Sequence, residues 1–260
     1  MQFHIKYPNV SVAVCERRIE AIPQLIQDVP NLQAIILDDA YQHREIVADF
    51  NILLTDYNNL YTDDFFIPTG DLRDERKSAK RASIIVVTKC PKDLSEAERV
   101  EIIEKLYPEQ HQSVFFTAIE YETPYHIYHP TDQWVLTMRD EVLLVCGIAN
   151  PLPLKNYLHE HTHTYYQLSY NDHHIFSIED LKEIKEKFEE IQAKSKLILT
   201  TEKDAVRLVK YTEELHDIPL YVLPIKPIFL FDAEPIFNQL VMDYVAQFYT
   251  NNNGKEREKY

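Results

Sequence analysis

The segment AIILDDAYQH, residues 34–43, joins an apolar run directly to two adjacent acids. A short run of Ile and Leu is typical of a strand in a parallel sheet that is covered on both faces. Functional side chains gather at the carboxyl ends of such strands, where a carboxylate can hold Mg²⁺. The segment therefore predicts a strand that ends at Asp38 and Asp39, which form either a magnesium site or an ordinary polar junction with solvent.

Similar apolar runs alternate with helical patterns along the rest of the chain. The helix expected at LSEAERVEIIEKLY has Ser95 as its N-cap. This alternation indicates an α/β architecture. Further strands are predicted at VSVAV (10–14), FNILLTD (50–56), SIIVVTKC (83–90), SVFFTAIEY (113–121), EVLLVCGIANP (141–151), THTYYQLSY (162–170) and SKLILTT (195–201).

The pattern changes near residue 124, where an extended hairpin or linker separates two α/β regions. We expect no order in the polar sequence that ends the chain. The predicted organisation is an α/β core over 1–123, a linker over 124–140, a smaller α/β domain over 141–230, a C-terminal helix over 231–248 and a disordered tail over 249–260.

Composition limits the possible partners. The formal net charge of −15 argues against broad nucleic-acid binding and against a polybasic membrane anchor. The three cysteines form no C-x-x-C pair, so a zinc knuckle is not expected. No apolar run approaches the length of a membrane-spanning helix.

The scarcity of glycine excludes two phosphate-binding motifs. The sequence has only Gly70, Gly147 and Gly254. A Walker A loop requires G-x-x-x-x-G-K-[ST], and a dinucleotide fingerprint requires three glycines close together. Residues 1–260 therefore contain neither motif.

Two further polar segments are candidate sites. In NDHHIFSIED, Asp172 can orient a neighbouring imidazole, so His173 or His174 could act as a base or bind phosphate, or the segment could be a polar loop before a helix capped by Ser177. In LRDERKSAKRA, arginines such as Arg73 suit bidentate phosphate contacts, or the stretch could be an exposed helix face.

Six segments span most of the chain in a fixed order: LDDAYQHR, PTGDLRD, VVTK, CGIANP, DHHIFSIEDL and LTTEKDAVRL. Together they resemble the tetraacyldisaccharide 4'-kinase family of lipid A biosynthesis. The resemblance implies a P-loop NTPase-like parallel sheet joined by an extended linker to a smaller α/β domain.

The resemblance also implies a function. Members of this family transfer the γ-phosphate of ATP to the 4'-hydroxyl of tetraacyldisaccharide 1-phosphate, which gives lipid IVA. They use Mg²⁺ and act in the cytoplasm at the surface of the inner membrane of Gram-negative bacteria, on the way to lipopolysaccharide. The expected partners are therefore ATP, the lipid A disaccharide precursor and the inner-membrane surface, without nucleic acid.

The family motifs carry residue roles to matching positions. The resemblance assigns Mg²⁺ binding to Asp38 and Asp39, and it places Gln42 and His43 with the substrate near the cleft.

Two other motifs carry roles as well. Arg73 and Asp74 match a basic element near phosphate and are expected to bind substrate. Asp172, His173 and His174 match a catalytic segment in which a histidine assists a catalytic aspartate, and His173 is preferred for that role.

The sequence departs from the family in three ways. Ala40 stands where the family has glycine, and LRDE replaces LREP. The P-loop, the GDEP segment with its catalytic aspartate and the hydrophobic N-terminal helix have no counterpart in residues 1–260. We therefore expect a truncated kinase that is inactive and poorly stable alone, with weakened membrane contact.

Two alternatives remain open from sequence. The first is a DHH-type metal-dependent phosphoesterase built on Asp38, Asp39, Asp56 and the DHH segment, which needs no P-loop. Manganese binding with phosphodiester hydrolysis is expected for it. The second is a non-catalytic remnant that binds lipid without turnover.

Overall fold

The computed structural model describes residues 2–172 and 174–257. Contacts divide the chain into two compact units. Unit 1 comprises residues 1–12 and 121–226, and unit 2 comprises residues 13–120 and 227–260. Both units are built from parallel strands and helices, which confirms the α/β class. The finer boundaries at 123, 140 and 230 stay predictions.

Unit 1 contains a five-stranded sheet in the order β4-β8-β7-β5-β6. Its four long strands are parallel, and the short β4 pairs antiparallel with β8. Since parallel sheets are covered on both faces, their strands are almost continuously apolar. The strands are β4 (Tyr125–His126), β5 (Glu141–Cys146), β6 (Thr164–Ser169), β7 (Lys196–Thr201) and β8 (Leu220–Leu223).

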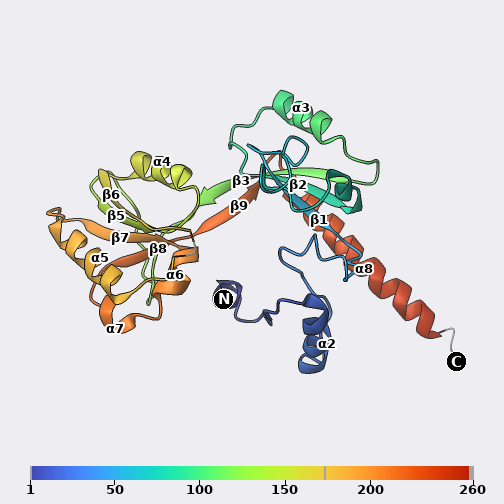
Figure 1. Ribbon diagram of the computed structural model, residues 1–260, viewed down its shortest axis with the longest axis horizontal. Helices are drawn as coiled ribbons and strands as arrows, with labels where there is room; N and C mark the ends of the chain where they lie inside the picture. The colour runs from blue at the N-terminus through green and yellow to red at the C-terminus, as the bar shows by residue number, and fades with distance from the viewer. Residues whose placement is uncertain (1, 173, 258–260) are drawn as a thin grey trace. The chain divides into compact units, whose positions relative to one another are not determined.

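Helices cover both faces of this sheet, as Figure 1 shows. Leu144 on β5 packs with Leu154 and Leu158 of α4, whereas Leu143 packs with Leu181 and the rest of the opposite core. Successive strand residues point to opposite faces, so one strand serves both cores. The helices of unit 1 are α1 (Gln2–Lys6), α4 (Leu152–His161), α5 (Ile178–Glu190), α6 (Glu202–Leu208) and α7 (Thr212–Leu215).

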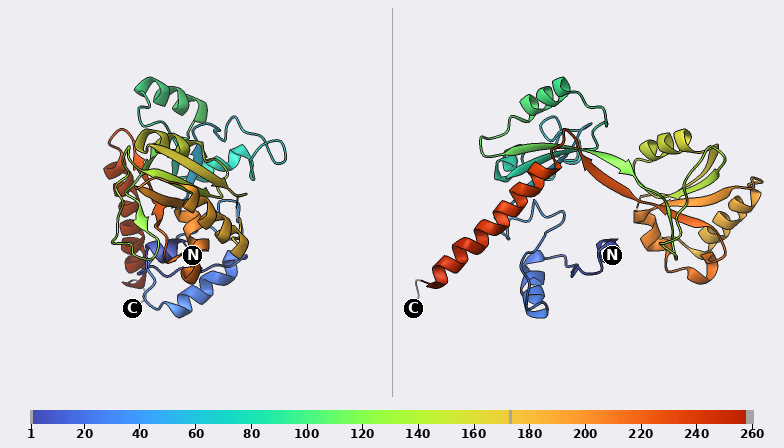
Figure 2. Two further views of the ribbon diagram at one scale, coloured as in Figure 1. Left: turned by 90° about the vertical axis from the view of Figure 1, so that its left-hand side faces the viewer. Right: turned by 180° about the vertical axis from the view of Figure 1, so that it is seen from behind.

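Unit 2 contains a four-stranded sheet in the order β1-β2-β3-β9. α3 covers one face and the first turns of α8 cover the other (Figure 2). Ile85 lies in the core beneath α3, and Ile84 lies in the core beneath α8. The elements are α2 (Arg18–Asp28), β1 (Ile52–Asp56), the 3₁₀ helix η1 (Arg76–Arg81), β2 (Ile84–Thr88), α3 (Glu96–Leu106), β3 (Ser113–Tyr121), β9 (Ile225–Phe229) and α8 (Glu234–Arg257).

Two predicted strands are absent from the described chain. Residues 10–14 and 34–38 are irregular, and Val14 and Ile36 are 90% and 94% exposed. β1 is consequently an edge strand, with Leu54 64% exposed. An apolar run becomes a strand only when another strand satisfies its backbone groups, and neither segment finds that partner here. The prediction that Asp38 and Asp39 end a strand is therefore wrong for this structure.

The predicted disordered tail is also wrong in part. α8 begins at Glu234 and continues to Arg257, so residues 249–257 are helical. Once a helix has formed, each added residue gains a backbone hydrogen bond, and the polar sequence extends it despite weak propensity. None of the helices in the described ranges is long and apolar enough to span a membrane.

The capping box that begins α3 carries a first stability prediction. The Ser95 hydroxyl accepts a hydrogen bond from the Glu98 amide at 3.3 Å, and the Glu98 carboxylate accepts one from the Ser95 amide at 2.9 Å. Ser95→Ala is expected to lower the stability of α3 by about 1 kcal/mol, because an amide at the helix start loses its partner.

Hydrogen exchange of the α3 amides measures this loss, since it reports unit 2 directly. Ser11→Ala is a matched control, because Ser11 is exposed and lies outside every helix. Equal exchange rates in Ser95→Ala and in the control would contradict the role of the cap.

Candidate functional site

The acidic segment in unit 2 meets the basic stretch directly. Arg73 donates hydrogen bonds to both carboxylate oxygens of Asp39, at 3.0 Å from Nη1 to Oδ2 and through a shorter contact from Nη2 to Oδ1. These bonds hold the pKa of Asp39 below its usual value. The side chain of Asp39 is 61% exposed and that of Arg73 is 53% exposed. The predicted metal ligand and the predicted phosphate ligand therefore lie side by side at the surface.

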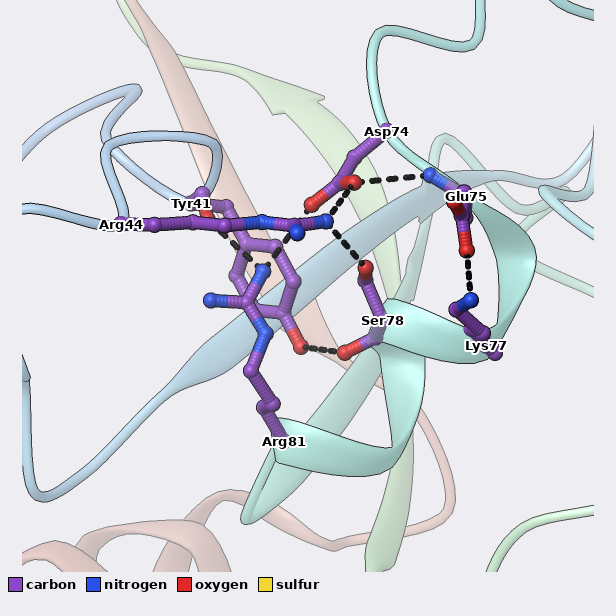
Figure 3. Close-up of polar contacts among 7 residues, drawn as sticks. All are labelled: Tyr41, Arg44, Asp74, Glu75, Lys77, Ser78 and Arg81. Carbon is purple, nitrogen blue, oxygen red and sulfur yellow. Dashed lines mark hydrogen bonds and ion pairs between the residues drawn. The ribbon is translucent and has the colours of Figure 1, made fainter.

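The residues next to this pair form a second polar cluster (Figure 3). Asp74 accepts hydrogen bonds from Arg44 at 2.5 Å and from Arg81 at 3.0 Å. Burial raises the pKa of Asp74, but hydrogen bonds from the Glu75 amide and Arg44 outweigh it and lower the pKa overall. Asp74 is thus an ionised carboxylate held between two guanidinium groups.

Gln42 and His43 lie on the same turn and are half-buried. The His43 amide donates to the Ala40 carbonyl at 2.9 Å, which closes the turn after the two acids. A side-chain hydrogen bond from Gln42 contributes to the lowered pKa of Asp39, after the larger effect of Arg73. The structure therefore gathers the unit 2 candidates from sequence around one loop.

The donor set fits a weakly held, hydrated cation. Within residues 2–172 and 174–257, no three or more His, Cys, Asp or Glu side chains form a metal cage. Mg²⁺ keeps several waters and is commonly held by one or two carboxylates together with substrate phosphates. Asp38 and Asp39 suit that mode, provided that Arg73 moves from Asp39 to a phosphate.

Asp56 does not join that pair. It lies at the end of β1, where its carboxylate accepts hydrogen bonds from Lys89 at 2.7 Å and from the Asn58 amide at 2.9 Å. Burial opposes ionisation, but these bonds lower the pKa of Asp56. The three-aspartate metal cluster of the phosphoesterase alternative is therefore not formed among the described residues.

The DHH segment lies in unit 1, after β6. His174 lies 2.8 Å from Asp180, measured from Nε2 to Oδ2, and its ring stacks on Tyr170 with centroids 4.6 Å apart. Asp180 also accepts a hydrogen bond from the Ser177 amide in the capping box of α5. His174 thus contacts the first turn of α5, and Ser177 is the cap of that helix, as predicted.

The other two residues of the segment are placed differently. Asp172 forms an ion pair with Lys203, with 2.5 Å between Oδ1 and Nζ. Lys203 lies in the first turn of α6, so this contact ties the DHH segment to the TTEKD segment. His173, the preferred catalytic residue, lies outside the described residues.

A buried carboxylate organises the carboxyl edge of the unit 1 sheet. Asp204 is fully buried and accepts hydrogen bonds from the Gly147 amide at 2.9 Å, the Thr201 hydroxyl at 2.8 Å and Arg207 at 3.2 Å. A methyl group on Gly147 would lie 2.8 Å from the Asn171 carbonyl, so glycine permits this close approach. Sequence reasoning missed the link, because it joins residues 57 positions apart.

This edge is also a topological switch point. β5 lies between β6 and β7, and the chain leaves β5 toward β6 but leaves β7 toward β8. Open parallel sheets bind ligands outside the carboxyl ends of strands at such points. The CGIANP, DHH and TTEKD segments follow β5, β6 and β7, so all three occupy this edge.

The three free cysteines give a chemical test of this packing. Burial raises the pKa of both Cys90 and Cys146 to about 11, whereas Cys15 is half-buried. Since the thiolate is the reactive form, we expect only Cys15 to react quickly with a disulfide reagent in the folded chain at pH 8. The coloured thiolate that the reagent releases is measured before and after urea is added, and it gives the number of cysteines that have reacted. Fast reaction of all three cysteines in the native chain would contradict the prediction.

Comparisons with known proteins agree with these motifs. The family model for tetraacyldisaccharide-1-P 4'-kinase matches residues 2–245. A tetraacyldisaccharide 4'-kinase of Bacteroides thetaiotaomicron is 37% identical over 99% of this chain and 71% of its own length. That of Flavobacterium johnsoniae is 42% identical over 95% of this chain and 69% of its own length.

A solved structure shares the fold. The crystal structure of LpxK from Aquifex aeolicus in complex with ATP superposes with a TM-score of 0.61 at 22% identity. The match covers 90% of this chain and 65% of that protein. It supports the expected relation to P-loop NTPase-like α/β folds. The family model and the two relatives show that the chain belongs to the tetraacyldisaccharide 4'-kinase family of lipid A biosynthesis.

Proposed function

We propose that this chain serves the Mg²⁺-dependent transfer of the ATP γ-phosphate to the 4'-hydroxyl of tetraacyldisaccharide 1-phosphate. In that reaction the hydroxyl oxygen bonds to the γ-phosphorus, the bond to the bridging oxygen of ADP breaks, and the hydroxyl proton passes to a base. The product is lipid IVA. The observation that carries the proposal is the direct contact between Asp39 and Arg73.

This contact combines the two kinds of charge that phosphoryl transfer needs. Catalysis of such transfers rests on positioning and on stabilising the charge of the phosphoryl oxygens. Asp38 and Asp39 would hold Mg²⁺, which would supply part of that stabilisation. Arg73 would release Asp39 and bind a phosphate oxygen in its place, since a guanidinium binds carboxylate and phosphate with the same planar geometry.

The remaining roles follow the same assignment. Gln42 and His43 lie on the loop of the two acids and would contact the substrate, with Asp74 beside them. Asp172, His173 and His174 would form the catalytic segment that receives or orients the hydroxyl proton. The site of action would be the cytoplasmic surface of the inner membrane, where the lipid substrate is held.

We further propose that residues 1–260 alone do not catalyse the transfer of phosphate from ATP to the lipid. Residues 1–260 contain no G-x-x-x-x-G-K-[ST] loop, the motif whose backbone amides cradle the phosphates of ATP in P-loop enzymes. Loss of even one such donor commonly slows a reaction by roughly 10²–10³. The chain would then bind the phosphorylated lipid without transferring phosphate at a measurable rate.

The experiment combines binding and turnover on the chain. Tetraacyldisaccharide 1-phosphate in mixed micelles is titrated with Mg²⁺ and ATP, while lipid binding and radiolabelled lipid product are followed. Lipid binding that needs the 1-phosphate supports the substrate assignment, and Mg²⁺-dependent ATP binding that is weakened by Arg73→Gln but unchanged in Lys77→Gln supports the role of Arg73. Lys77 is a suitable control, because it is exposed on η1 and pairs with Glu75.

Three outcomes would oppose the proposal. Absence of lipid binding overturns the substrate assignment. Mg²⁺-dependent transfer at a rate typical of kinases overturns the proposed inactivity. Manganese-dependent hydrolysis of a phosphodiester favours the phosphoesterase alternative over the kinase.

A further inference from the structure

Arg81 belongs to the basic stretch of unit 2, and contacts with Tyr41 and Asp74 hold its side chain. It is the last residue of η1 and is 40% exposed. Its guanidinium lies over the Tyr41 ring at 4.6 Å from the centroid. One nitrogen, Nη2, also donates to the Tyr41 carbonyl at 3.0 Å and to Asp74 at 3.0 Å (Figure 3). A single side chain thus binds the ring and the backbone of one residue and a carboxylate on another loop.

Tyr41 is held from its other end as well. Its hydroxyl donates to the Ser78 carbonyl on η1 at 2.8 Å. Arg44, three residues further along, donates to Asp74 at 2.5 Å and to the Ser78 hydroxyl at 3.2 Å. Figure 3 shows these groups converging from the loop and from η1. The turn that carries the two acids is therefore fastened to η1 by side chains.

No strand pairing in the described chain holds the segment that carries Asp38 and Asp39 in place. The chain between α2 and β1, which the structure describes throughout, forms neither helix nor strand. Its local backbone hydrogen bonds near the acids run from His43 to Ala40 at 2.9 Å, from Arg44 to Gln42 at 3.0 Å and from Ile46 to His43 at 3.3 Å. A loop with so few backbone bonds opens readily unless side chains hold it. The contacts of Arg81 with Tyr41 fall in the middle of this loop.

We propose that Arg81 is a positioning residue for residues 38–43, acting through Tyr41 and Asp74. Tyr41 follows Asp39 by two positions and directly precedes Gln42. Fixing its carbonyl and ring therefore fixes the direction of the backbone on which the acids and Gln42 are mounted. Arg81 itself touches none of the acids that would bind the cation, and the inference rests on the proposed function only for its metal-binding consequence.

The chemistry requires arginine at this position. A guanidinium is planar, so it stacks on an aromatic face while its N–H groups donate within its own plane. An ammonium group can make a point contact with Asp74 but cannot stack and donate to the Tyr41 carbonyl in the same way. Arg81→Lys should therefore keep the charge and lose the positioning.

The test compares Arg81→Gln, Arg81→Lys and the neighbouring control Lys80→Gln. Lys80 pairs with Glu109 at 2.6 Å and makes none of the loop contacts. Hydrogen exchange of the His43 and Arg44 amides reports the loop, and the β2 amides report the fold of unit 2. Titration of the intact chain with Mn²⁺, followed by electron paramagnetic resonance, measures the metal affinity of the site proposed at Asp38 and Asp39.

We expect Arg81→Gln to speed exchange at His43 and Arg44 at least about tenfold, a change of roughly 1.4 kcal/mol in local opening. The β2 amides should exchange as in the unaltered chain. Arg81→Lys should resemble Arg81→Gln, and Lys80→Gln should resemble the unaltered chain. The dissociation constant for Mn²⁺ should rise several-fold in both Arg81 variants.

Three results would overturn the inference. Unchanged exchange at His43 and Arg44 in a folded Arg81→Gln chain shows that Arg81 does not hold the loop. Equal acceleration in the loop and in β2 shows a general structural role. Exchange rates at His43 and Arg44 in Arg81→Lys that equal those of the unaltered chain show that a guanidinium group is not required. If the unaltered chain binds no Mn²⁺, the metal role of Asp38 and Asp39 is overturned, while the exchange comparison still decides the role of Arg81.

Discussion

Asp204→Ala is expected to lower the free energy of unfolding of unit 1 by about 3–5 kcal/mol. The carboxylate is fully buried, and its three donors come from the turn after β5, the cap of α6 and Arg207. Removing it takes away the acceptor of the Gly147 amide in a buried position, and a buried donor that loses its acceptor costs more than the hydrogen bond itself contributes. The hydrogen bond from Arg207 is lost as well.

The protein carries a natural probe for this measurement. Its single tryptophan, Trp134, packs in the unit 1 core and contacts Tyr221 edge to face at 5.4 Å. Tryptophan fluorescence during urea unfolding therefore reports unit 1. Asp217→Ala is the matched control, because its side chain is 82% exposed, and it should change stability by less than about 0.5 kcal/mol.

Asp204→Asn removes the charge of the side chain but keeps its shape. Asp204→Asn keeps one oxygen, which can replace the Oδ2 that accepts from Gly147 and Thr201, but its amide group then faces the Arg207 guanidinium where Oδ1 accepts a hydrogen bond. It should therefore also destabilise unit 1, by about 1–3 kcal/mol. A loss below about 1 kcal/mol in Asp204→Ala would mean that water replaces the carboxylate. The carboxyl edge of the sheet would then not depend on the bond between the CGIANP and TTEKD segments.

Local signals in the sequence predicted much of the fold. The apolar runs that became β1, β2, β3, β5 and β7 are short and flanked by polar turns. The caps at Ser95 and Ser177 are set by residues three positions apart, so sequence alone locates both helix starts. Such features need no knowledge of distant chain segments.

The misses have a common physical cause. Residues 10–14 and 34–38 have the composition of strands, but strand formation depends on a partner that composition does not specify. The same holds for the site. Sequence motifs indicated Asp39 and Arg73, whereas the contacts of Arg81 with Tyr41 and of Asp204 with Gly147 join segments 40 and 57 residues apart. Long-range polar contacts leave no periodic pattern in the sequence.

Asp38→Asn and Arg73→Gln are expected to change Mn²⁺ affinity in opposite directions. Asp38→Asn removes one of the two proposed carboxylate ligands and should raise the dissociation constant by about tenfold or more, the size commonly seen when a residue that supports a metal site is lost. Arg73→Gln removes the cation that occupies Asp39 in this structure. It should lower the dissociation constant several-fold, since opposite charges about 4 Å apart near water interact by about 1 kcal/mol or more.

ATP should reverse the second effect. When a phosphate is present, Arg73 has an anion other than Asp39 to bind, and its loss should then weaken Mn²⁺-dependent ATP binding. Asp71→Asn and Lys77→Gln remove similar charges from exposed neighbours and should change neither affinity. Electron paramagnetic resonance titration with and without ATP measures all four variants.

The direction in which Arg73→Gln changes Mn²⁺ affinity decides between two functions for the contact of Asp39 with Arg73. If Arg73→Gln leaves Mn²⁺ affinity unchanged both with and without ATP, the contact with Asp39 is an exposed ion pair of the kind that contributes little to stability or binding. If the affinity rises without ATP and falls with it, Asp39 exchanges Arg73 for the cation while Arg73 moves to phosphate. That exchange is the behaviour that a site for metal-bound nucleotide requires, and an isolated surface ion pair does not produce it.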